Sequence, residues 1–425
     1  MTDQRKSEFP DIRLLNPIGS ALYEKTYKIL IITETFYPEI GGGESQARNL
    51  SVALASKGHQ VTLLTRRSRD FLPRRDEILK VGIARLPPSG LGQFKKWGML
   101  YSLVPYLLAN RRRFDLVLVS GFRIIGIAAA PLCRILRKPC VLKADSMGEM
   151  SGAFFGPGLA RIGLGSSNTL FRLINGLRHA LIRRATCYIA ISRAIRAELT
   201  SAGIGPAMIR DIPNCVDTDR YFPVSPTRKH GLRQKLDLPA EAPLVIYTGR
   251  LVTYKGLFTL LKAWRGLHER HPRAALILVG SGGQDIHNCE DALKDYARRE
   301  LPAGSVRFTG PVQNVEEYLQ ASDIFVLPTE NEAFGLSLVE AMACGLAVVS
   351  TGVDGVADIV ENRTTGLTVQ ARDEVDLQAA LDEILCDETL RHRLGKCAHK
   401  NVTQRYSIEG VTREYEKLFE ELLGV

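Results

Sequence analysis

The sequence lacks the features that mark membrane-spanning and secreted proteins. No apolar run reaches the roughly 18 residues of a membrane-spanning helix, and the nearest, "WGMLYSLVPYLLA", is shorter and contains a proline. The first residues are polar and of mixed charge, without the apolar core of a signal peptide. The eight cysteines form no C-x-x-C pair, so neither a disulfide framework nor a metal site is indicated. These absences predict a cytoplasmic protein that is soluble or lies on the surface of a membrane.

The charge of the chain is unevenly distributed. Residues 1–225 carry 33 Lys and Arg against 17 Asp and Glu, a net charge of +16. The other 200 residues carry 23 against 29, a net charge of −6, and +16 − 6 gives the +10 of the whole chain. The basic half lacks the interleaved aromatic residues or the recognisable module of a nucleic-acid-binding protein, so nucleic acid is not expected as a partner.

One basic stretch, "LFRLINGLRHALIRR" at 170–184, has the apolar spacing of an amphipathic helix. Its apolar stripe consists of Leu170, Leu173, Ile174, Leu177 and Leu181, with arginines outside it. One interpretation is a helix that packs this stripe into the core. The other is a face that rests on anionic lipid, where each basic residue contributes about 1 kcal/mol.

Strands and helices are predicted to alternate throughout the chain. "KILIIT" at 28–33, "QVTLLT" at 60–65 and "DLVLVS" at 115–120 are typical of buried strands, and the pattern restarts at "APLVIYTGR", residues 242–250. Such alternation predicts an α/β protein with parallel sheets covered by helices. We therefore expect two tandem, Rossmann-like, doubly wound domains that face each other across a cleft.

The predicted domain boundaries follow from composition. A loose extension covers residues 1–20, the first domain residues 21–222, and a linker rich in proline and charge residues 223–240. The second domain covers residues 241–405, and residues 406–425 form a final helix that packs back on the domains. Because 425 residues exceed one typical hydrophobic core, two domains are also expected from length alone.

Two loops that follow predicted strands could approach an anionic ligand. In "TETFYPEIGGGESQ", Gly42 and Gly43 allow close approach of the backbone, although three adjacent glycines are equally typical of a plain flexible turn. In "YTGRLVTYKG", Arg250 and Lys255 follow Gly249 and can converge on two phosphates. The alternative for these two cations is solvated surface.

The stretch "PTENEAFGLSLVEAMACG" places two carboxylates around the start of a predicted helix. The backbone amides near Gly335 and Leu336 belong to the first turn of that helix and have no partners within it, so they suit a diphosphate or sugar hydroxyls. Glu332 in the preceding loop is expected to point into the same pocket. Glu340, inside the helix, can accept the two hydroxyls of a ribose, and its alternative role is a surface salt bridge.

These segments together resemble glycosyltransferase family 4, the retaining nucleotide-sugar enzymes with the two-domain GT-B fold. The resemblance rests on "FYPEIGGGE", "IPNCVDTDRYF", "GRLVTYKG" and "PTENEAFGLSLVEAMACGLAVVST", and it covers nearly the whole chain from about residue 28. Its most specific part is the E-x7-E motif formed by Glu332 and Glu340.

The resemblance implies a role for each matching residue. Arg250 and Lys255 are expected to hold the diphosphate of a UDP- or GDP-sugar, Glu332 to bind the transferred sugar, and Glu340 to bind the ribose. The amides of residues 334–336, Phe334 to Leu336, are expected to line the sugar, with the glycine loop closing from the other domain. No cofactor and no metal is implied.

One departure concerns the first domain. Where the family often has a histidine near the donor sugar, this sequence reads "VLKADSMGEMSG", so Asp145 becomes a candidate for contact with the sugar or the acceptor. The resemblance and the basic first domain together predict a glycan acceptor, free or lipid-linked, in polysaccharide or glycolipid synthesis. The alternatives are a soluble small-molecule acceptor, a sugar-nucleotide-binding subunit without turnover, or an epimerase of related fold.

Overall fold

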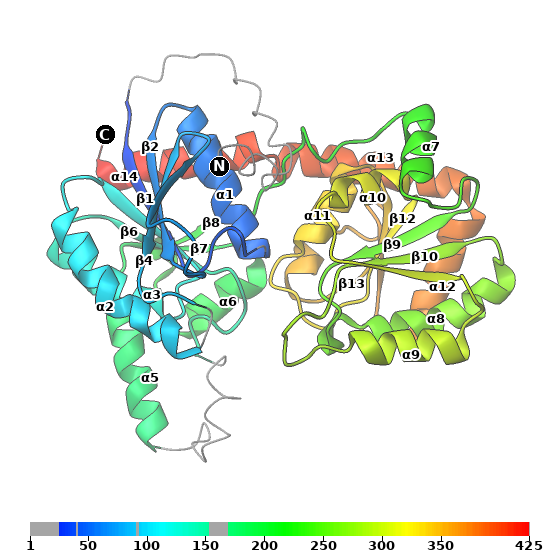
Figure 1. Cartoon of the computed structure of the whole chain (residues 1–425), viewed down its shortest axis with the longest axis horizontal. Helices are drawn as coiled ribbons and strands as arrows, with labels where there is room; N and C mark the ends of the chain where they lie inside the picture. Colours follow the sequence, from blue (N-terminus) through cyan, green and yellow to red (C-terminus); the bar gives the residue numbers. More distant parts are fainter. Residues whose placement is uncertain (1–24, 40, 91–92, 153–168, 425) are drawn as a thin grey trace. The chain divides into compact units, whose positions relative to one another are not determined.

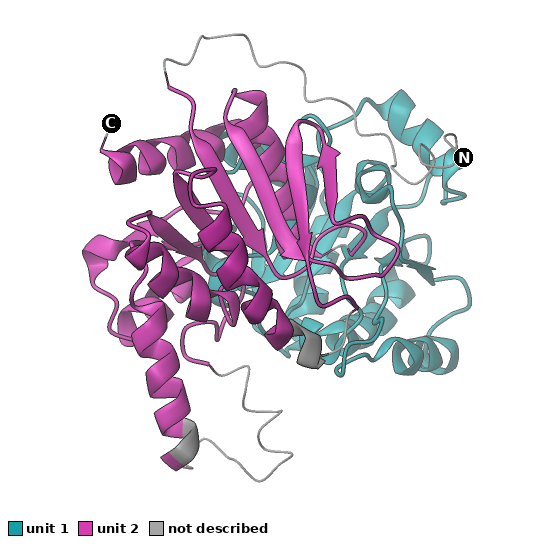
Figure 2. Ribbon diagram, turned by 60° about the vertical axis from the view of Figure 1, so that its left-hand side comes forward, with its two compact units in different colours: residues 1–12, 216–407 teal, residues 13–215, 408–425 magenta. Residues whose placement is uncertain are grey.

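The computed structural model describes residues 25–39, 41–90, 93–152 and 169–424, so the predicted extension over residues 1–20 lies outside the described residues. The described residues form two compact units, shown in different colours in Figure 2. Residues 25–215 and 408–424 form the first, here called the N-unit, and residues 216–407 form the C-unit. The final helix therefore belongs to the same unit as the N-terminal half.

The N-unit is built on an eight-stranded sheet in the order β3-β4-β2-β1-β5-β6-β7-β8. Neighbouring strands are parallel except for the antiparallel pair of β3 and β4. The strands are β1 (Lys28–Thr33), β2 (Gln60–Arg66), β3 (Arg75–Ile78), β4 (Val81–Leu86), β5 (Leu116–Ser120), β6 (Cys140–Lys143), β7 (Cys187–Ala190) and β8 (Ile209–Asp211).

Helices flank this sheet (Figure 1). They are α1 (Gly42–Ser56), α2 (Gln93–Ala109), α3 (Ile125–Ile135), α5 (Thr169–Ile182), α6 (Arg193–Ser201), the 3-10 turn η2 (Pro206–Met208) and α14 (Ile408–Leu423). Helix α1 packs on β1 and β2, α14 packs against α1, and α3 packs on β5 and β6. Each of these contacts buries apolar side chains, which is the main source of stability in such a layered fold.

The C-unit contains a six-stranded parallel sheet in the order β11-β10-β9-β12-β13-β14. Its strands are β9 (Leu244–Thr248), β10 (Ala275–Val279), β11 (Val306–Gly310), β12 (Ile324–Leu327), β13 (Ala347–Thr351) and β14 (Leu367–Val369). Its helices are α7 (Pro226–Lys235), η3 (Thr253–Lys255), α8 (Leu257–Arg270), α9 (Glu290–Glu300), α10 (Val315–Ala321), α11 (Leu336–Ala343), η4 (Asp354–Asp358), α12 (Glu374–Cys386) and α13 (Glu388–Arg405). The predicted alternation of strand and helix in two parallel-sheet units is confirmed.

The hairpin formed by β3 and β4 was not predicted from the sequence. Its two-residue turn consists of Leu79 and Lys80, which both have positive φ, 50° and 66°. Hairpin turns of this kind are usually occupied by Asn-Gly or Asp-Gly, which tolerate positive φ. A Leu-Lys pair carries no such signal, so the sequence pattern could not indicate a turn here.

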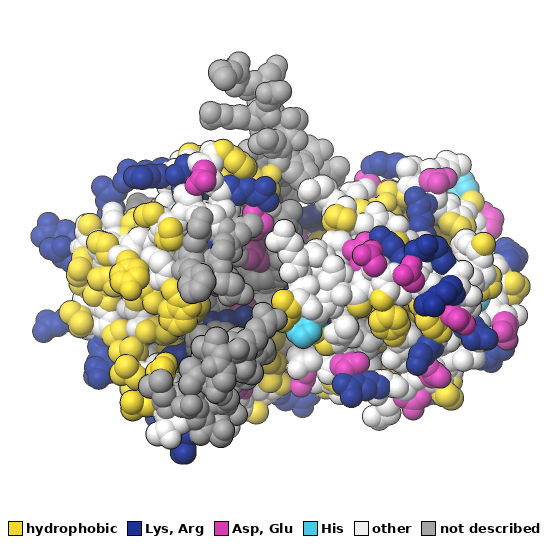
Figure 3. All heavy atoms as spheres, turned by 60° about the horizontal axis from the view of Figure 1, so that its bottom comes forward, with side chains coloured by type: hydrophobic (Ala, Val, Ile, Leu, Met, Phe, Trp, Pro, Cys, Tyr) yellow, Lys and Arg dark blue, Asp and Glu magenta, His cyan; other side chains and the backbone are white. Residues whose placement is uncertain are grey.

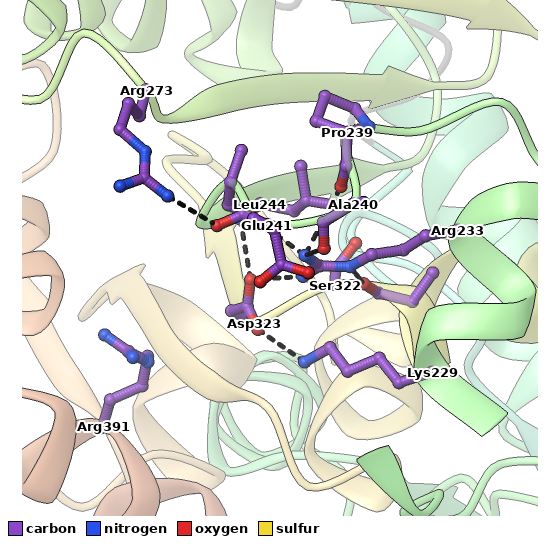
Figure 4. Close-up of polar contacts among 12 residues, drawn as sticks. Lys229, Arg233, Pro239, Ala240, Glu241, Leu244, Arg273, Ser322, Asp323 and Arg391 are labelled. Atoms are coloured by element: carbon purple, nitrogen blue, oxygen red, sulfur yellow. Dashed lines mark hydrogen bonds and ion pairs between the residues drawn. The ribbon is translucent and has the colours of Figure 1, made fainter. Parts of the chain in front are cut away.

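Residues 223–240, expected as a linker, contain helix α7, which is anchored to the C-unit. Ser225 caps the helix by accepting a hydrogen bond from the backbone N–H of Arg228. Buried Arg233 donates to the backbone oxygen of Ala321 at 2.9 Å. It also donates to the backbone oxygen of Ala240 at 2.7 Å (Figure 4). Asp323 accepts from Arg233 at 2.8 Å and from Lys229. The segment is therefore an ordered part of the C-unit.

Membrane crossing is not supported by the helices of the described residues. None of them combines the length and the apolar character that a membrane-spanning segment requires.

Candidate functional site

Arg250 and Lys255 lie in the loop that follows β9, as expected, and both approach the ring of Tyr254. The Arg250 guanidinium carbon and the Lys255 Nζ each lie 5.8 Å from the centroid of that ring. The Arg250 side chain is exposed and donates to Asp285 at 2.6 Å. Two cations therefore lie near one aromatic ring, an arrangement that can hold a doubly charged anion.

Lys255 also connects this loop to the loop that carries Glu332. Its Nζ forms an ion pair with Glu332 Oε2, and both side chains are largely buried. The two loops meet because β9 and β12 are neighbours in the parallel sheet, so their carboxyl ends lie at one edge. Gly256 permits the approach, since a Cβ atom there would lie 1.8 Å from the Pro328 carbonyl oxygen.

Gly335 begins α11 in a conformation that favours glycine. Its φ of 103° and ψ of 58° lie in the left-handed region, and no side chain caps the helix. The amides of Leu336 and the residue after it are in the first turn, where N–H groups have no intrahelical partner. The Phe334 ring instead packs edge-on against Tyr406, at a centroid distance of 5.7 Å. Only the backbone of Phe334 is thus available to a ligand.

Glu340 lies in the second turn of α11 and is half-buried. Burial raises its pKa to about 7, although the charge of Arg220 and a hydrogen bond from Tyr221 oppose this rise. Arg220 itself donates to Glu316 at 2.6 Å. Arg220 and Tyr221, from the segment "IPNCVDTDRYF", are therefore next to Glu340, which makes a simple surface salt bridge a poor description of this residue.

Two aspartates near these loops were missed by the sequence-based reasoning. Asp354 Oδ2 accepts a hydrogen bond from the Glu332 backbone N–H at 3.3 Å. Asp285 holds Arg250, as described above. Both residues follow strands, β13 and β10, of the same parallel sheet. Their position after a strand was the one signal in the sequence that could have identified them.

In the N-unit, Gly43 and Asp145 come together at the carboxyl ends of β1 and β6. A Cβ atom on Gly43 would lie 3.4 Å from Asp145 Oδ2, which is an ordinary contact. Asp145 accepts from Ser120 Oγ at 2.7 Å and forms an ion pair with Lys143. Gly42 begins α1 next to them.

Glu44 adds a second carboxylate to this part of the N-unit and was not foreseen. It accepts a hydrogen bond from Thr35 Oγ1, and its pKa is raised, mainly by burial. Asp145 contributes to the same rise through its charge. Two carboxylates and Lys143 thus form a polar group that can bind sugar hydroxyls by accepting and donating hydrogen bonds.

The loop that follows Asp145 is held by two further glutamates. Glu149 is buried and accepts from the backbone N–H groups of Phe122 at 2.8 Å and Asp145 at 3.1 Å. Glu198 accepts from Gly148 at 2.8 Å, and also from the two backbone N–H groups of residues 150 and 151 at 2.9 Å each. These bonds fix residues 145–151, and residues 153–168 lie outside the described part of the chain.

The residues predicted as one site thus fall into two groups. Arg250, Lys255, Glu332 and the start of α11 are together in the C-unit, with Glu340 further along the helix. Gly42, Gly43 and Asp145 are together in the N-unit.

Gly249 follows β9 directly and has a φ of 151°, and a Cβ atom there would lie 2.7 Å from the Tyr247 hydroxyl. Glycine is therefore required at this position for the Arg250 loop to form.

Two family models match adjacent parts of the chain. Residues 40–220 match Glycosyltransferase Family 4, and residues 229–401 match Glycosyl transferases group 1.

Among curated relatives, a D-inositol 3-phosphate glycosyltransferase of Corynebacterium jeikeium is 32% identical over 50% of this chain and 52% of its own length. The match therefore spans about half of that enzyme. A lipopolysaccharide core biosynthesis glycosyltransferase of Rhizobium meliloti is 28% identical over 91% of this chain and 98% of its own.

Two solved structures share the architecture. A sucrose-phosphate synthase from Thermosynechococcus elongatus aligns with a TM-score of 0.78 at 24% identity, over 93% of this chain and 99% of its own. The Anabaena protein HepE, in complex with UDP-glucose, aligns with a TM-score of 0.73 at 20% identity, over 93% and 100%. These likenesses concern the fold, and they confirm the prediction of two α/β domains of the GT-B type.

Proposed function

Because this chain belongs to the glycosyltransferases that combine a family 4 with a group 1 domain, we propose that it transfers a sugar from a UDP- or GDP-sugar to a glycan acceptor. We further propose that the anomeric configuration is retained. The observation that carries the proposal is the ion pair of Lys255 with Glu332, beside Arg250 and the uncapped start of α11. This arrangement offers positive charge for a diphosphate next to a carboxylate for a sugar hydroxyl.

In the proposed reaction the leaving group is a nucleoside diphosphate. Arg250, Lys255 and the first amides of α11 stabilise the negative charge that develops on it as the bond to the anomeric carbon breaks. The acceptor oxygen forms the new bond to the anomeric carbon on the face that the diphosphate leaves, and the proton of the acceptor hydroxyl passes to the departing diphosphate. Glu332 orients the sugar, and Glu340 accepts hydrogen bonds from the ribose hydroxyls. These cations and amides supply the charge stabilisation that a metal would otherwise give, so we propose that no metal cofactor takes part.

Asp145 is the proposed contact of the N-unit with the transferred sugar or the acceptor. Ser120 and Lys143 bind its carboxylate from two directions and thereby fix its orientation. The buried Glu149, which accepts from the Asp145 backbone N–H, fixes the main chain at the same point.

The proposed donor site is tested by thermal unfolding of the protein with UDP, GDP and ADP, and with the common nucleotide-sugars of each. A nucleotide at 100 times its dissociation constant should stabilise the protein by about 2.7 kcal/mol. Lys255→Ala should abolish this stabilisation, whereas the exposed Lys262→Ala on α8 should retain it. The HepE complex makes UDP-glucose the first donor to test. If no nucleotide shifts the transition, the donor site is refuted. If the protein binds a nucleotide-sugar but releases no nucleotide from it when extracts that contain acceptors are added, the protein is a binding subunit without turnover.

A lipid-linked acceptor at an anionic membrane is supported by the outer surface of the N-unit. In α5 three residues of the apolar stripe face solvent, Leu173 at 70% exposure, Ile174 at 57% and Leu177 at 63%, while Arg178 on the same helix is buried. The interpretation as a core-packed stripe is therefore wrong for these positions. In α2, which packs on α3 as α5 does, Tyr101 is 85% exposed and Leu108 is also exposed.

The charged residues within these two helical segments are of one sign. Neither residues 93–114 nor residues 169–186 contain an Asp or a Glu, whereas they contain five and four Lys and Arg respectively. Figure 3 shows hydrophobic side chains gathered on the forward face of this unit, with Lys and Arg side chains at its margin. Apolar side chains inside a basic margin fit the interface of an anionic bilayer, where about 1 kcal/mol per basic residue adds to apolar burial.

Vesicle co-sedimentation tests this surface. The full chain should bind vesicles that contain phosphatidylglycerol at low salt, bind neutral vesicles more weakly, and lose binding when Leu173, Ile174 and Leu177 are all changed to Ser. Ile286→Ser, equally exposed but in the C-unit, is the matched control. If the triple variant binds like the control variant, or if the protein ignores anionic vesicles, the acceptor is better sought among soluble molecules.

A further inference from the structure

Three side chains of different metal-binding types converge at one end of the C-unit. His271 follows the last residue of α8, and Asp382 and Cys386 are one turn apart on α12, which packs against α8. His271 Nε2 lies 2.7 Å from Asp382 Oδ1 and 3.9 Å from Cys386 Sγ. All three ligand atoms lie within 4.8 Å of one another. We propose that His271, Asp382 and Cys386 bind Zn²⁺ or a similar thiophilic divalent cation.

The chemistry of the three ligands selects this class of ion. Imidazole nitrogen, carboxylate oxygen and thiolate sulfur are the three ligand types of protein zinc sites, whereas Mg²⁺ and Ca²⁺ bind oxygen ligands. Zinc needs distances of about 2.0–2.2 Å to nitrogen and oxygen and about 2.3 Å to sulfur. Tetrahedral binding then separates the ligand atoms by roughly 3.4–3.7 Å. The observed 2.7 Å and 3.9 Å bracket that range, so small side-chain movements bring the atoms into place.

The surroundings of the three ligands are also those of a metal site. Arg270 donates to Asp382 Oδ2 at 2.6 Å and leaves Oδ1 directed toward His271. Metal-binding carboxylates are commonly oriented by such an outer hydrogen bond. Cys386 is exposed, and His271 and Asp382 are partly exposed, so an ion can enter from solvent and a water can complete a fourth position.

The proposed ion joins α8 to α12 rather than taking part in sugar transfer. Helix α8 has 14 residues, so its two ends are about 21 Å apart. Lys255 precedes its first turn, while His271 follows its last. The ion would therefore hold the far end of the helix that carries the proposed diphosphate loop, and its effect would be on the stability of the C-unit. This inference does not depend on the proposed function.

Cobalt substitution tests the site on the full chain. After treatment with a chelator, Co²⁺ should produce a thiolate-to-cobalt charge-transfer band that saturates at one ion per chain and is displaced by Zn²⁺. Cys386→Ser should abolish the band. Cys397→Ser, which removes the other cysteine that is not buried, should leave it unchanged. Arg270→Gln should weaken Zn²⁺ binding about tenfold.

Three results with Co²⁺ would each overturn the proposal: no band with excess Co²⁺, a band that persists in Cys386→Ser, or a band that disappears in Cys397→Ser. His271→Gln gives an independent check, because it should reduce Zn²⁺ affinity while the unfolding temperature without metal shows whether the variant is folded. If Zn²⁺ raises the unfolding temperature of the His271→Gln and Cys386→Ser variants as much as that of the wild type, the three residues form only a hydrogen-bonded group.

Discussion

Glu340 should make donor binding depend on pH. Its pKa of about 7 means that roughly a tenth of the carboxyl is ionised at pH 6 and roughly nine tenths at pH 8. If only the ionised form accepts the ribose hydroxyls, the apparent dissociation constant of a nucleotide-sugar falls about tenfold between these pH values, or about 1.4 kcal/mol. Calorimetric titration at a series of pH values measures this slope directly.

The choice of ligand and the control variants decide whether Glu340 causes the pH dependence of donor binding. A nucleotide-sugar is preferable to a free nucleotide, since a terminal phosphate itself titrates near pH 6. Glu340→Gln should bind more weakly at pH 8 and lose the slope, because its side chain has no charge to gain. Glu149, whose pKa burial also raises to about 7, belongs to the N-unit, and Glu149→Gln should keep the slope. An unchanged slope in Glu340→Gln would refute the reasoning.

Two further predictions concern the C-unit. Asp323→Ala should destabilise the protein to urea by about 3–5 kcal/mol, because it leaves Arg233 buried without its carboxylate. Burial opposes ionisation of Asp323, but its cationic neighbours and a backbone N–H hold its pKa below the usual value. The stability difference between the wild type and Asp323→Ala should therefore disappear only as the pH falls through that lowered pKa. Gly355→Ala should weaken nucleotide binding and cost about 1–3 kcal/mol of stability, because its Cβ would lie 2.2 Å from the Ala333 carbonyl oxygen. Gly352→Ala meets no atom within 4 Å and should behave like the wild type, and equal nucleotide affinity in the two variants would contradict this account.

The sequence alone determined the central strands of both sheets and the loops that contain Arg250, Lys255 and Glu332. Continuous apolar runs indicated the central strands of both units, because a strand buried on both faces needs apolar side chains at every position. Strand-to-helix loops then identified Arg250, Lys255 and Glu332, since ligands of parallel sheets bind at the carboxyl ends of strands. The positions of these strands and loops could be predicted because they depend on local pattern and chain order.

Only the tertiary structure decided which side chains meet and which surfaces remain exposed. The sequence could not place Asp354 beside Glu332, because that contact depends on the neighbouring positions of β12 and β13 in the sheet. Nor could it decide whether the stripe of α5 is buried, since an amphipathic pattern does not specify which face packs. The convergence of His271 with Asp382 and Cys386 has the same origin: residues more than 100 positions apart become neighbours only when two helices pack.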